Sequence, residues 1–176
     1  MLALYLTIWL ALALFVAGET GRALSRGSRP PGWAWRAFTL GLVLALVHTV
    51  IAFHVVHNWA HADAVSATVR QTQAVFGVAV GWGVYVNYVF YGVWLVDAVW
   101  WRLSPELSRR PAAVTWSLRG FYLLIILNAA VIFAAGPRRV LGVMLVSWLV
   151  GIFFGGQILF LARSVHERRL RARNKI

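Results

Sequence analysis

The sequence contains no cysteine and only five acidic residues among its 176 residues. The lack of cysteine excludes disulfide bonds, thiolate metal sites, iron–sulfur clusters and cysteine nucleophiles. Charged residues make up 12% of the chain, whereas hydrophobic residues make up 61%. Because so few charges cannot cover the surface of a water-soluble domain of this size, the composition predicts an integral membrane protein.

Motifs of known catalytic chemistry are also missing. The sequence has no glycine-rich nucleotide loop and no recognisable serine–histidine–aspartate pattern. Catalytic residues are therefore unknown from the sequence, and it is undecided whether the protein is an enzyme.

The net charge of +12 comes from 17 Lys and Arg residues. These residues lie in the gaps between apolar runs and form no compact basic domain. We therefore expect them to contact the anionic head groups of a lipid bilayer, and we expect no binding of nucleic acid.

Five apolar runs approach or exceed the roughly 20 residues that cross a bilayer. The sequence thus predicts an all-α polytopic membrane protein, a five-helix bundle in a single transmembrane domain of residues 1–176. The transmembrane helices are expected at about residues 2–18, 37–61, 74–101, 118–135 and 140–162. Residues 62–73, which contain no Gly or Pro, predict a helical extension outside the membrane, and residues 163–176 predict a basic cytoplasmic tail.

Lys and Arg are distributed unequally between the two sides of this bundle. Fourteen of the 17 lie on one side, and only Arg70, Arg138 and Arg139 lie on the other. The positive-inside rule then places the N-terminus outside and the C-terminus in the cytoplasm. We expect a multi-pass protein of a bacterial-type inner membrane.

Four of the five histidines fall within the fourteen positions 48–61. On a continuous helix, at about 100° per residue, His54, His57 and His61 lie within about 60° of one another. Neutral imidazole is a common ligand for transition metals. The stripe therefore predicts a Cu, Zn or Fe site at the outer end of the second helix, with a role in redox, oxygen-handling or metal-delivery chemistry.

Four further residues are expected to orient or complete this metal site. They are Asn58, Asp63, Tyr85 and Met144. A haem held by His54 and Met144 is a less favoured alternative, because no histidine lies in any other expected membrane helix. The histidines can also be interpreted as interfacial residues that hydrogen-bond without a metal, beside Trp59 of an aromatic belt.

A second polar group is expected near the middle of the membrane. It consists of His48, Asn87 and Asn128, which should face inward because polar side chains are costly in hydrocarbon. Hydrogen bonds between helices are the first interpretation. A proton site or a site for a quinone head group is the alternative.

Asp97 is expected near the cytoplasmic end, about 15 Å or more from the histidines along the helix axis. It therefore belongs to another site, and we expect a structural ion pair. The arginines at comparable depth are Arg36, Arg102, Arg119 and Arg163.

Three functions are compatible with these patterns. The first is the metal protein described above, and the second is a non-catalytic accessory subunit of a larger membrane complex. The third, a small proton-coupled transporter, is disfavoured because only one acidic residue is clearly inside the membrane. Small-residue patterns at Gly77–Gly81 and Gly151–Gly155 predict close helix packing or contacts in a homo-oligomer.

Overall fold

The computed structural model describes residues 2–25, 29–106 and 110–173, with side chains described up to residue 155. All regular structure in this part of the chain is helical, so the all-α prediction is confirmed. The elements are α1 (Leu2–Leu24), α2 (Gly32–Val55), α3 (His61–Phe76), α4 (Gly83–Leu103), α5 (Ala112–Leu127), η2 (Asn128–Ile132) and α6 (Pro137–Arg173). The element η2 is a π-helix that directly continues α5.

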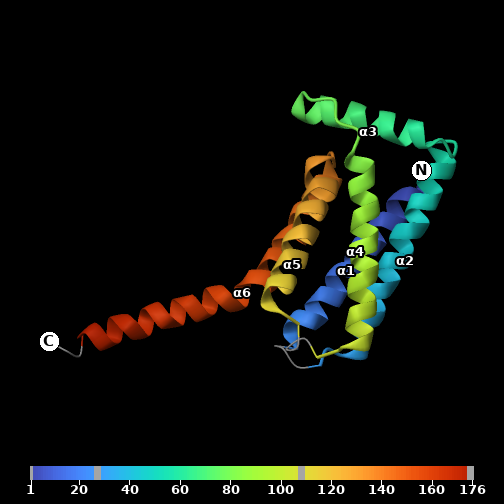
Figure 1. The fold of residues 1–176 in the computed structure, drawn as a ribbon. Coiled ribbons are helices and arrows are strands. Elements are labelled where there is room, and N and C mark those ends of the chain that lie inside the picture. Colours follow the sequence, from blue (N-terminus) through green and yellow to red (C-terminus); the bar gives the residue numbers. More distant parts are fainter. Residues whose placement is uncertain (1, 26–28, 107–109, 174–176) are drawn as a thin grey trace.

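Helices α1, α2, α4 and α5 and the first part of α6 pack together lengthwise, and α3 lies across one end of them (Figure 1). We call this end of the bundle the α3 end. The most extensive contact joins α1 to α2. Glycines allow it, since a Cβ atom at Gly18 would lie 2.7 Å from Phe38 Cβ and one at Gly41 would lie 2.9 Å from Ala11 O. The two backbones can therefore approach closely.

Most glycines of the two predicted small-residue patterns do not make such close helix contacts. A Cβ atom at Gly77, Gly151 or Gly155 would meet nothing within 4 Å in the described part of the chain. Gly81 does pack, against Val65 of α3. Close packing with other described residues is thus absent at Gly151 and Gly155, and contacts in a homo-oligomer stay a prediction there.

Four helical segments in the described residues are long and apolar enough to cross a membrane. They are α1, α2, Ala112–Ile132 (α5 with η2) and Pro137–Gly155 of α6. Helix α4 is not among them, although its 21 residues extend about 31 Å. Its Asn87 and Asp97 lower its mean hydropathy.

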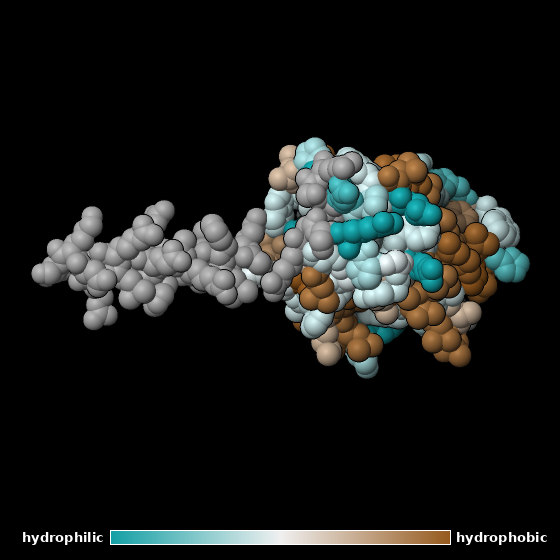
Figure 2. All heavy atoms as spheres, turned by 90° about the horizontal axis from the view of Figure 1, so that it is seen from below, coloured by the Kyte–Doolittle hydropathy of each residue, from teal (hydrophilic) through white to brown (hydrophobic). Residues whose placement is uncertain are grey.

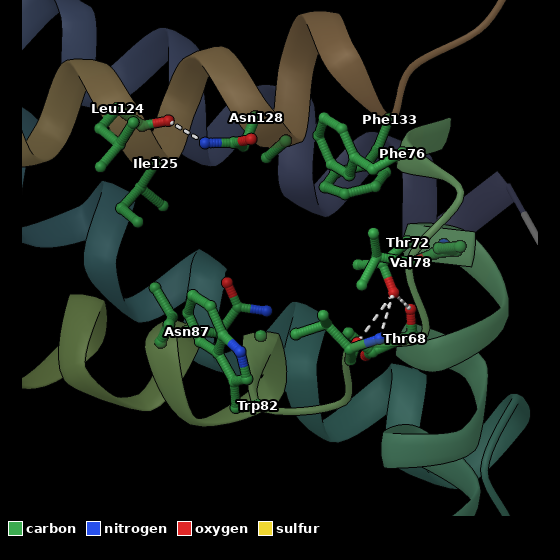
Figure 3. A pocket seen from close by; sticks show the side chains of 15 residues that line it. Thr68, Thr72, Phe76, Val78, Trp82, Asn87, Leu124, Ile125, Asn128 and Phe133 are labelled. Atoms are coloured by element: carbon green, nitrogen blue, oxygen red, sulfur yellow. Dashed lines mark hydrogen bonds between the residues drawn. The ribbon is translucent and has the colours of Figure 1, made fainter. Parts of the chain in front are cut away.

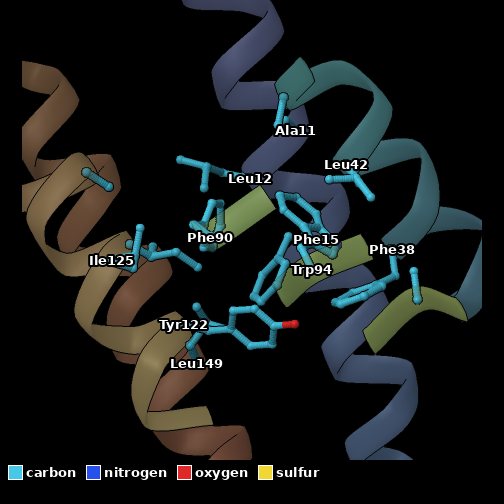
Figure 4. Close-up of a cluster of buried hydrophobic side chains, with 14 of the residues drawn as sticks. Ala11, Leu12, Phe15, Phe38, Leu42, Phe90, Trp94, Tyr122, Ile125 and Leu149 are labelled. Atoms are coloured by element: carbon cyan, nitrogen blue, oxygen red, sulfur yellow. The ribbon is translucent and has the colours of Figure 1, made fainter. Parts of the chain in front are cut away.

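An aromatic core joins four of the helices. Phe15 of α1, Phe38 of α2, Phe90 and Trp94 of α4, and Tyr122 of α5 are buried together (Figure 4). The ring centroid of Phe15 lies 5.0 Å from that of Trp94 and 5.1 Å from that of Tyr122, both in edge-on geometry. Such aromatic contacts add to the stability from buried area and fix α4 against α1, α2 and α5.

The opposite end of the bundle differs from its sides. Seen from that end, hydrophilic side chains gather in the middle and hydrophobic ones lie around them (Figure 2). Large exposed apolar side chains such as Leu40, Val50, Val96 and Trp148 cover the sides of the helices. Exposed apolar area on this scale is typical of a surface that contacts lipid or another protein.

Candidate functional site

The histidine segment does not form one helix, so the expected three-histidine stripe is wrong. Helix α2 ends at Val55, six residues before the expected end. Asn58 and Trp59 follow with φ angles of 46° and 60°, in the left-handed region that ends a right-handed helix. The amide N of Trp59 donates to Phe53 O over 2.9 Å, which closes the end of α2. The chain then turns, and α3 begins at His61.

The turn separates the three imidazoles. His54, in the last turn of α2, accepts a hydrogen bond at Nδ1 from Nε1 of Trp59 over 3.2 Å. His57 lies inside the turn, where its ring packs edge-on against Phe53 with 5.7 Å between centroids. The ring of His61 stacks on the same Phe53 at 6.5 Å. His57 and His61 therefore share Phe53 as an aromatic neighbour, whereas His54 packs beside Trp59.

His61 fastens the start of α3 to α4. Its Nε2 lies 3.3 Å from Oη of Tyr85, and its Nδ1 lies 3.3 Å from Oη of Tyr88. In neutral imidazole one ring nitrogen donates and the other accepts, so one tyrosine accepts a hydrogen bond and the other donates one. Tyr85 was expected to orient the metal ligands or to complete their site, and it contacts the predicted ligand His61 directly.

No group of three or more His, Cys, Asp or Glu side chains in the described residues is placed to hold a metal ion. Asp63 is exposed in the first turn of α3, where a carboxylate is favourable near the helix N-terminus. Ala60 is the N-cap of this helix. Met144 is 64% exposed on α6, and Asn58 lies in the left-handed turn. The arrangement thus lacks a three-histidine coordination sphere.

The expected mid-membrane group divides into two parts and lies nearer the α3 end. His48 Nδ1 is 2.9 Å from Leu4 O and 3.3 Å from Thr7 Oγ1, so it bridges α2 and α1. Asn87 is the fifth residue of α4, about 6 Å from the start of that helix. Asn128 begins η2. The expected position of Asn87 near the middle of its helix was wrong because α4 begins at Gly83 and not at Ala74.

Asn87 and Asn128 come together at a cavity of about 520 Å³ between α3, α4, α5 and η2. They lie on opposite sides of it (Figure 3). Phe76, Trp82 and Phe133 contribute aromatic lining, and the lining contains no ionisable side chain among the described residues. Most of the cavity wall is therefore apolar, with a few amide and hydroxyl groups.

Helix α3 covers this cavity and is fixed at both ends. Besides the contacts of His61, Thr72 Oγ1 accepts a hydrogen bond from Val80 N over 3.0 Å and lies 2.9 Å from Val80 O. Gly83 allows α4 to approach α3, since a Cβ atom there would lie 3.0 Å from Thr68 Cγ2. These contacts hold Thr68 and Thr72 at the cavity wall.

The π-helix η2 shapes the wall opposite α3. Phe133 N donates to Asn128 O over 2.9 Å, an i to i+5 bond that widens the helix by one residue. Such π-bulges occur frequently at functional sites. The side-chain amide of Asn128 donates one hydrogen bond to Leu124 O over 2.7 Å. Within the described chain its carbonyl oxygen has no further partner, and the side chain of Asn87 has none.

A second polar cluster lies at the opposite end of the bundle, around Asp97. Its Oδ1 is 2.7 Å from Nη2 of Arg110, and its Oδ2 is 3.0 Å from Nη1 of Arg22 and accepts a hydrogen bond from Tyr122 over 3.0 Å. Asp97, Arg22 and Tyr122 are buried. Asp97 thus forms ion pairs, but not with Arg36, Arg102 or Arg119. The side chain of Arg163, the fourth arginine considered from the sequence, lies outside the described residues.

Glu19 and Arg22 complete this cluster. Arg22 Nη1 lies 2.7 Å from Glu19 Oε1, without hydrogen-bond geometry at that oxygen. The guanidinium of Arg22 stacks 4.0 Å from the ring of Trp101. Both residues were expected in a loop because α1 was expected to end at Gly18. Their i, i+3 spacing of opposite charges was the signal in the sequence for a longer helix.

No family model, curated protein or solved structure matches this chain. Any function must therefore rest on the chemistry of the sites themselves. The Asp97 cluster is fully packed and joins α1, α4, α5 and residue 110. The cavity beneath α3 combines apolar walls with a few polar groups, a mixture that is typical of small-molecule sites.

Proposed function

We propose that this chain is a five-span protein of a bacterial-type inner membrane that binds a small amphiphilic molecule beneath α3. The single observation that carries the binding function is the cavity of about 520 Å³. This volume lies within the range of about 300–1,000 Å³ that is common for small-molecule sites. The chain would act as a membrane-embedded binding protein.

The membrane arrangement is supported by helix length, packing and charge. Helix α4 is long enough to cross the bilayer, and its buried Trp94 packs against Phe15 of α1 and Phe38 of α2. As the fifth span it would place Asp63 outside and Glu106 in the cytoplasm. The three basic residues Arg70, Arg138 and Arg139 then lie on the outer side, in agreement with the positive-inside rule.

The route to the cavity follows from this arrangement. The α3 end would lie at the outer surface of the membrane, where α3 rests over the ends of α4 and α5. A ligand with an apolar body would enter from the outer leaflet, because the cavity walls are mostly apolar. Asn87 and Asn128 would orient its polar part, as the few polar groups of such pockets do.

The first experiment narrows the cavity and measures bound ligand. Protein is purified in mild detergent, and lipids that co-purify are identified by native mass spectrometry and extraction. Wild-type protein should retain a small amphiphile, and Ala129→Phe, which puts a ring into the cavity wall, should reduce its occupancy at least fivefold. Leu127→Phe is the matched control, since Leu127 is partly exposed and does not line the cavity. Equal occupancy in both variants would refute the binding site.

A transition-metal site (Cu, Zn or Fe) at His54, His57 and His61 is the second candidate function. The observation that favours it is that Phe53 contacts the rings of both His57 and His61 at the α2–α3 turn. Coordination would require His54 and His61 to leave their present partners Trp59, Tyr85 and Tyr88. A haem held by His54 and Met144 is less favoured, because His54 would likewise have to leave Trp59.

Elemental analysis and an absorption spectrum test the metal site. Protein purified without chelators should carry close to one metal ion per chain, and His57→Ala should lose it. His48→Gln should keep the ion, because His48 contacts α1 and lies outside the turn. Wild-type protein free of metal and haem would exclude this function, and co-purification of other subunits with an empty cavity would favour an accessory role.

A further inference from the structure

We infer that the ligand of the cavity beneath α3 is an uncharged lipid with a quinone-type ring, held between Asn87 and Asn128. This inference rests on the proposed binding function and specifies its ligand class. It depends on three properties of the lining: the absence of charge, the placement of Asn87 and Asn128 on opposite sides, and the aromatic residues around them. A third side-chain amide in the lining, that of Gln71, comes from α3.

The absence of charge in the lining disfavours a ligand with an ionic head group. None of the described residues that line the cavity is Asp, Glu, His, Lys or Arg. A phosphate or ammonium group moved from water into such a site would lose its hydration without gaining an ion pair. Phospholipids with a charged head group therefore fit this cavity poorly, whereas an uncharged head group that accepts hydrogen bonds fits well.

The two amides can bind both edges of one ring. Asn87 comes from α4 and Asn128 from η2, on opposite sides of the cavity (Figure 3). Each side-chain amide has two N–H donors and one carbonyl acceptor, and Asn128 uses one donor on Leu124 O. A quinone carries carbonyl oxygens on opposite edges of a flat ring, so each amide can donate to one of them. The amide oxygens can accept hydrogen bonds from the hydroxyl groups of the reduced form.

Aromatic side chains provide surfaces for a flat ring. The rings of Phe76 and Phe133 meet edge to face with 5.9 Å between centroids, and Trp82 lines the same cavity. Flat rings pack on such side chains in stacked or edge-on geometry. The apolar Val86 and Ile125 at the wall suit the start of a hydrocarbon tail. A neutral glycerolipid would satisfy the charge condition but would leave this aromatic lining without a partner ring.

Fluorescence quenching tests the inference directly. Protein in phosphatidylcholine nanodiscs is titrated with decyl-ubiquinone, and the saturable part of tryptophan quenching is measured. We expect saturable quenching in wild-type protein and a clear reduction of its amplitude in Trp82→Phe. Asn87→Leu and Asn128→Leu should each weaken the apparent affinity about five- to tenfold, as expected for the loss of one hydrogen bond.

Two further variants serve as a negative and a positive control, one away from the cavity and one in its wall. Ser147→Leu also replaces a polar residue by leucine, on an exposed position of α6 away from the cavity, and should bind as wild type does. Ala129→Phe should abolish the saturable quenching. Unchanged affinity in both asparagine variants would overturn the role of the amides.

Competition separates the failure of the inference from that of the proposed function. If dioleoylglycerol or phosphatidylglycerol displaces the bound lipid and decyl-ubiquinone does not, the quinone class is wrong and the binding function stands. If no lipid binds saturably and none co-purifies, the inference and the proposed function are both wrong. Displacement by decyl-ubiquinone alone would support both.

Discussion

At the scale of single residues, Asp97 is the most completely paired polar group in the described chain. It faces two arginines and one tyrosine hydroxyl at distances of 2.7–3.0 Å. Taking ions out of water is costly, so such a cluster can contribute little net stability compared with an apolar core. Removal of one partner, in contrast, strongly lowers stability, because it leaves the remaining charges buried without compensation.

We therefore expect Asp97→Asn to lower the free energy of unfolding by about 3–5 kcal/mol. The amide can still accept a hydrogen bond from Tyr122, but it no longer neutralises Arg22 and Arg110. Unfolding in detergent, followed by circular dichroism, measures the change. Asp63→Asn, an exposed position on α3, should change the free energy by less than about 0.5 kcal/mol.

Glu19 offers a comparison within the same cluster. Its Oε1 has no hydrogen-bond partner, and Arg22 keeps Asp97 when Glu19 is neutral. Glu19→Gln should thus cost less than Asp97→Asn. An equal or larger loss for Glu19→Gln would show that the carboxylate of Glu19, and not that of Asp97, is the main counterion of Arg22.

At the scale of the elements, hydropathy indicated where apolar helices lie but not where they end. The long apolar runs around α1, α2, α5 and α6 were found because their composition is unambiguous. The end of α2 at Val55 was missed because no Gly or Pro precedes the turn. It depends on left-handed angles at Asn58 and Trp59, and tryptophan rarely signals such a conformation.

The cavity beneath α3 was not predicted for the same reason, because the ends of α3 and α4 could not be located from hydropathy. The start of α4 was placed nine residues too early, since the first three residues of the expected helix, 74–76, belong to α3 and residues 77–82 form a connection with two glycines. Gly77, with a φ of 71°, ends α3, and the chain turns before Gly83. Only this turn brings Asn87 to the level of α3. Asn87 and Asn128 were recognised in the sequence by their polarity. No sequence pattern indicated that a π-helix would place Asn128 across a cavity from Asn87.

At the scale of the whole molecule, the two ends of the bundle carry different chemistry. One end holds the buried ion cluster around Asp97, and the other holds the covered cavity with neutral polar groups. In a membrane, five spans that include α4 would place the two termini in different compartments, whereas four spans without α4 would place them in the same one. The span of α4 is therefore the feature on which the proposed orientation depends.

The lack of cysteine makes this span directly testable. A single cysteine introduced by Asp63→Cys lies before α4, and one introduced by Glu106→Cys lies after it, both at exposed positions. In intact cells a membrane-impermeant maleimide should label Asp63→Cys, and should label Glu106→Cys only after the membrane is permeabilised. Labelling of both in intact cells would mean that α4 does not cross the membrane. The reverse pattern would invert the orientation and place the entry to the cavity in the cytoplasmic leaflet.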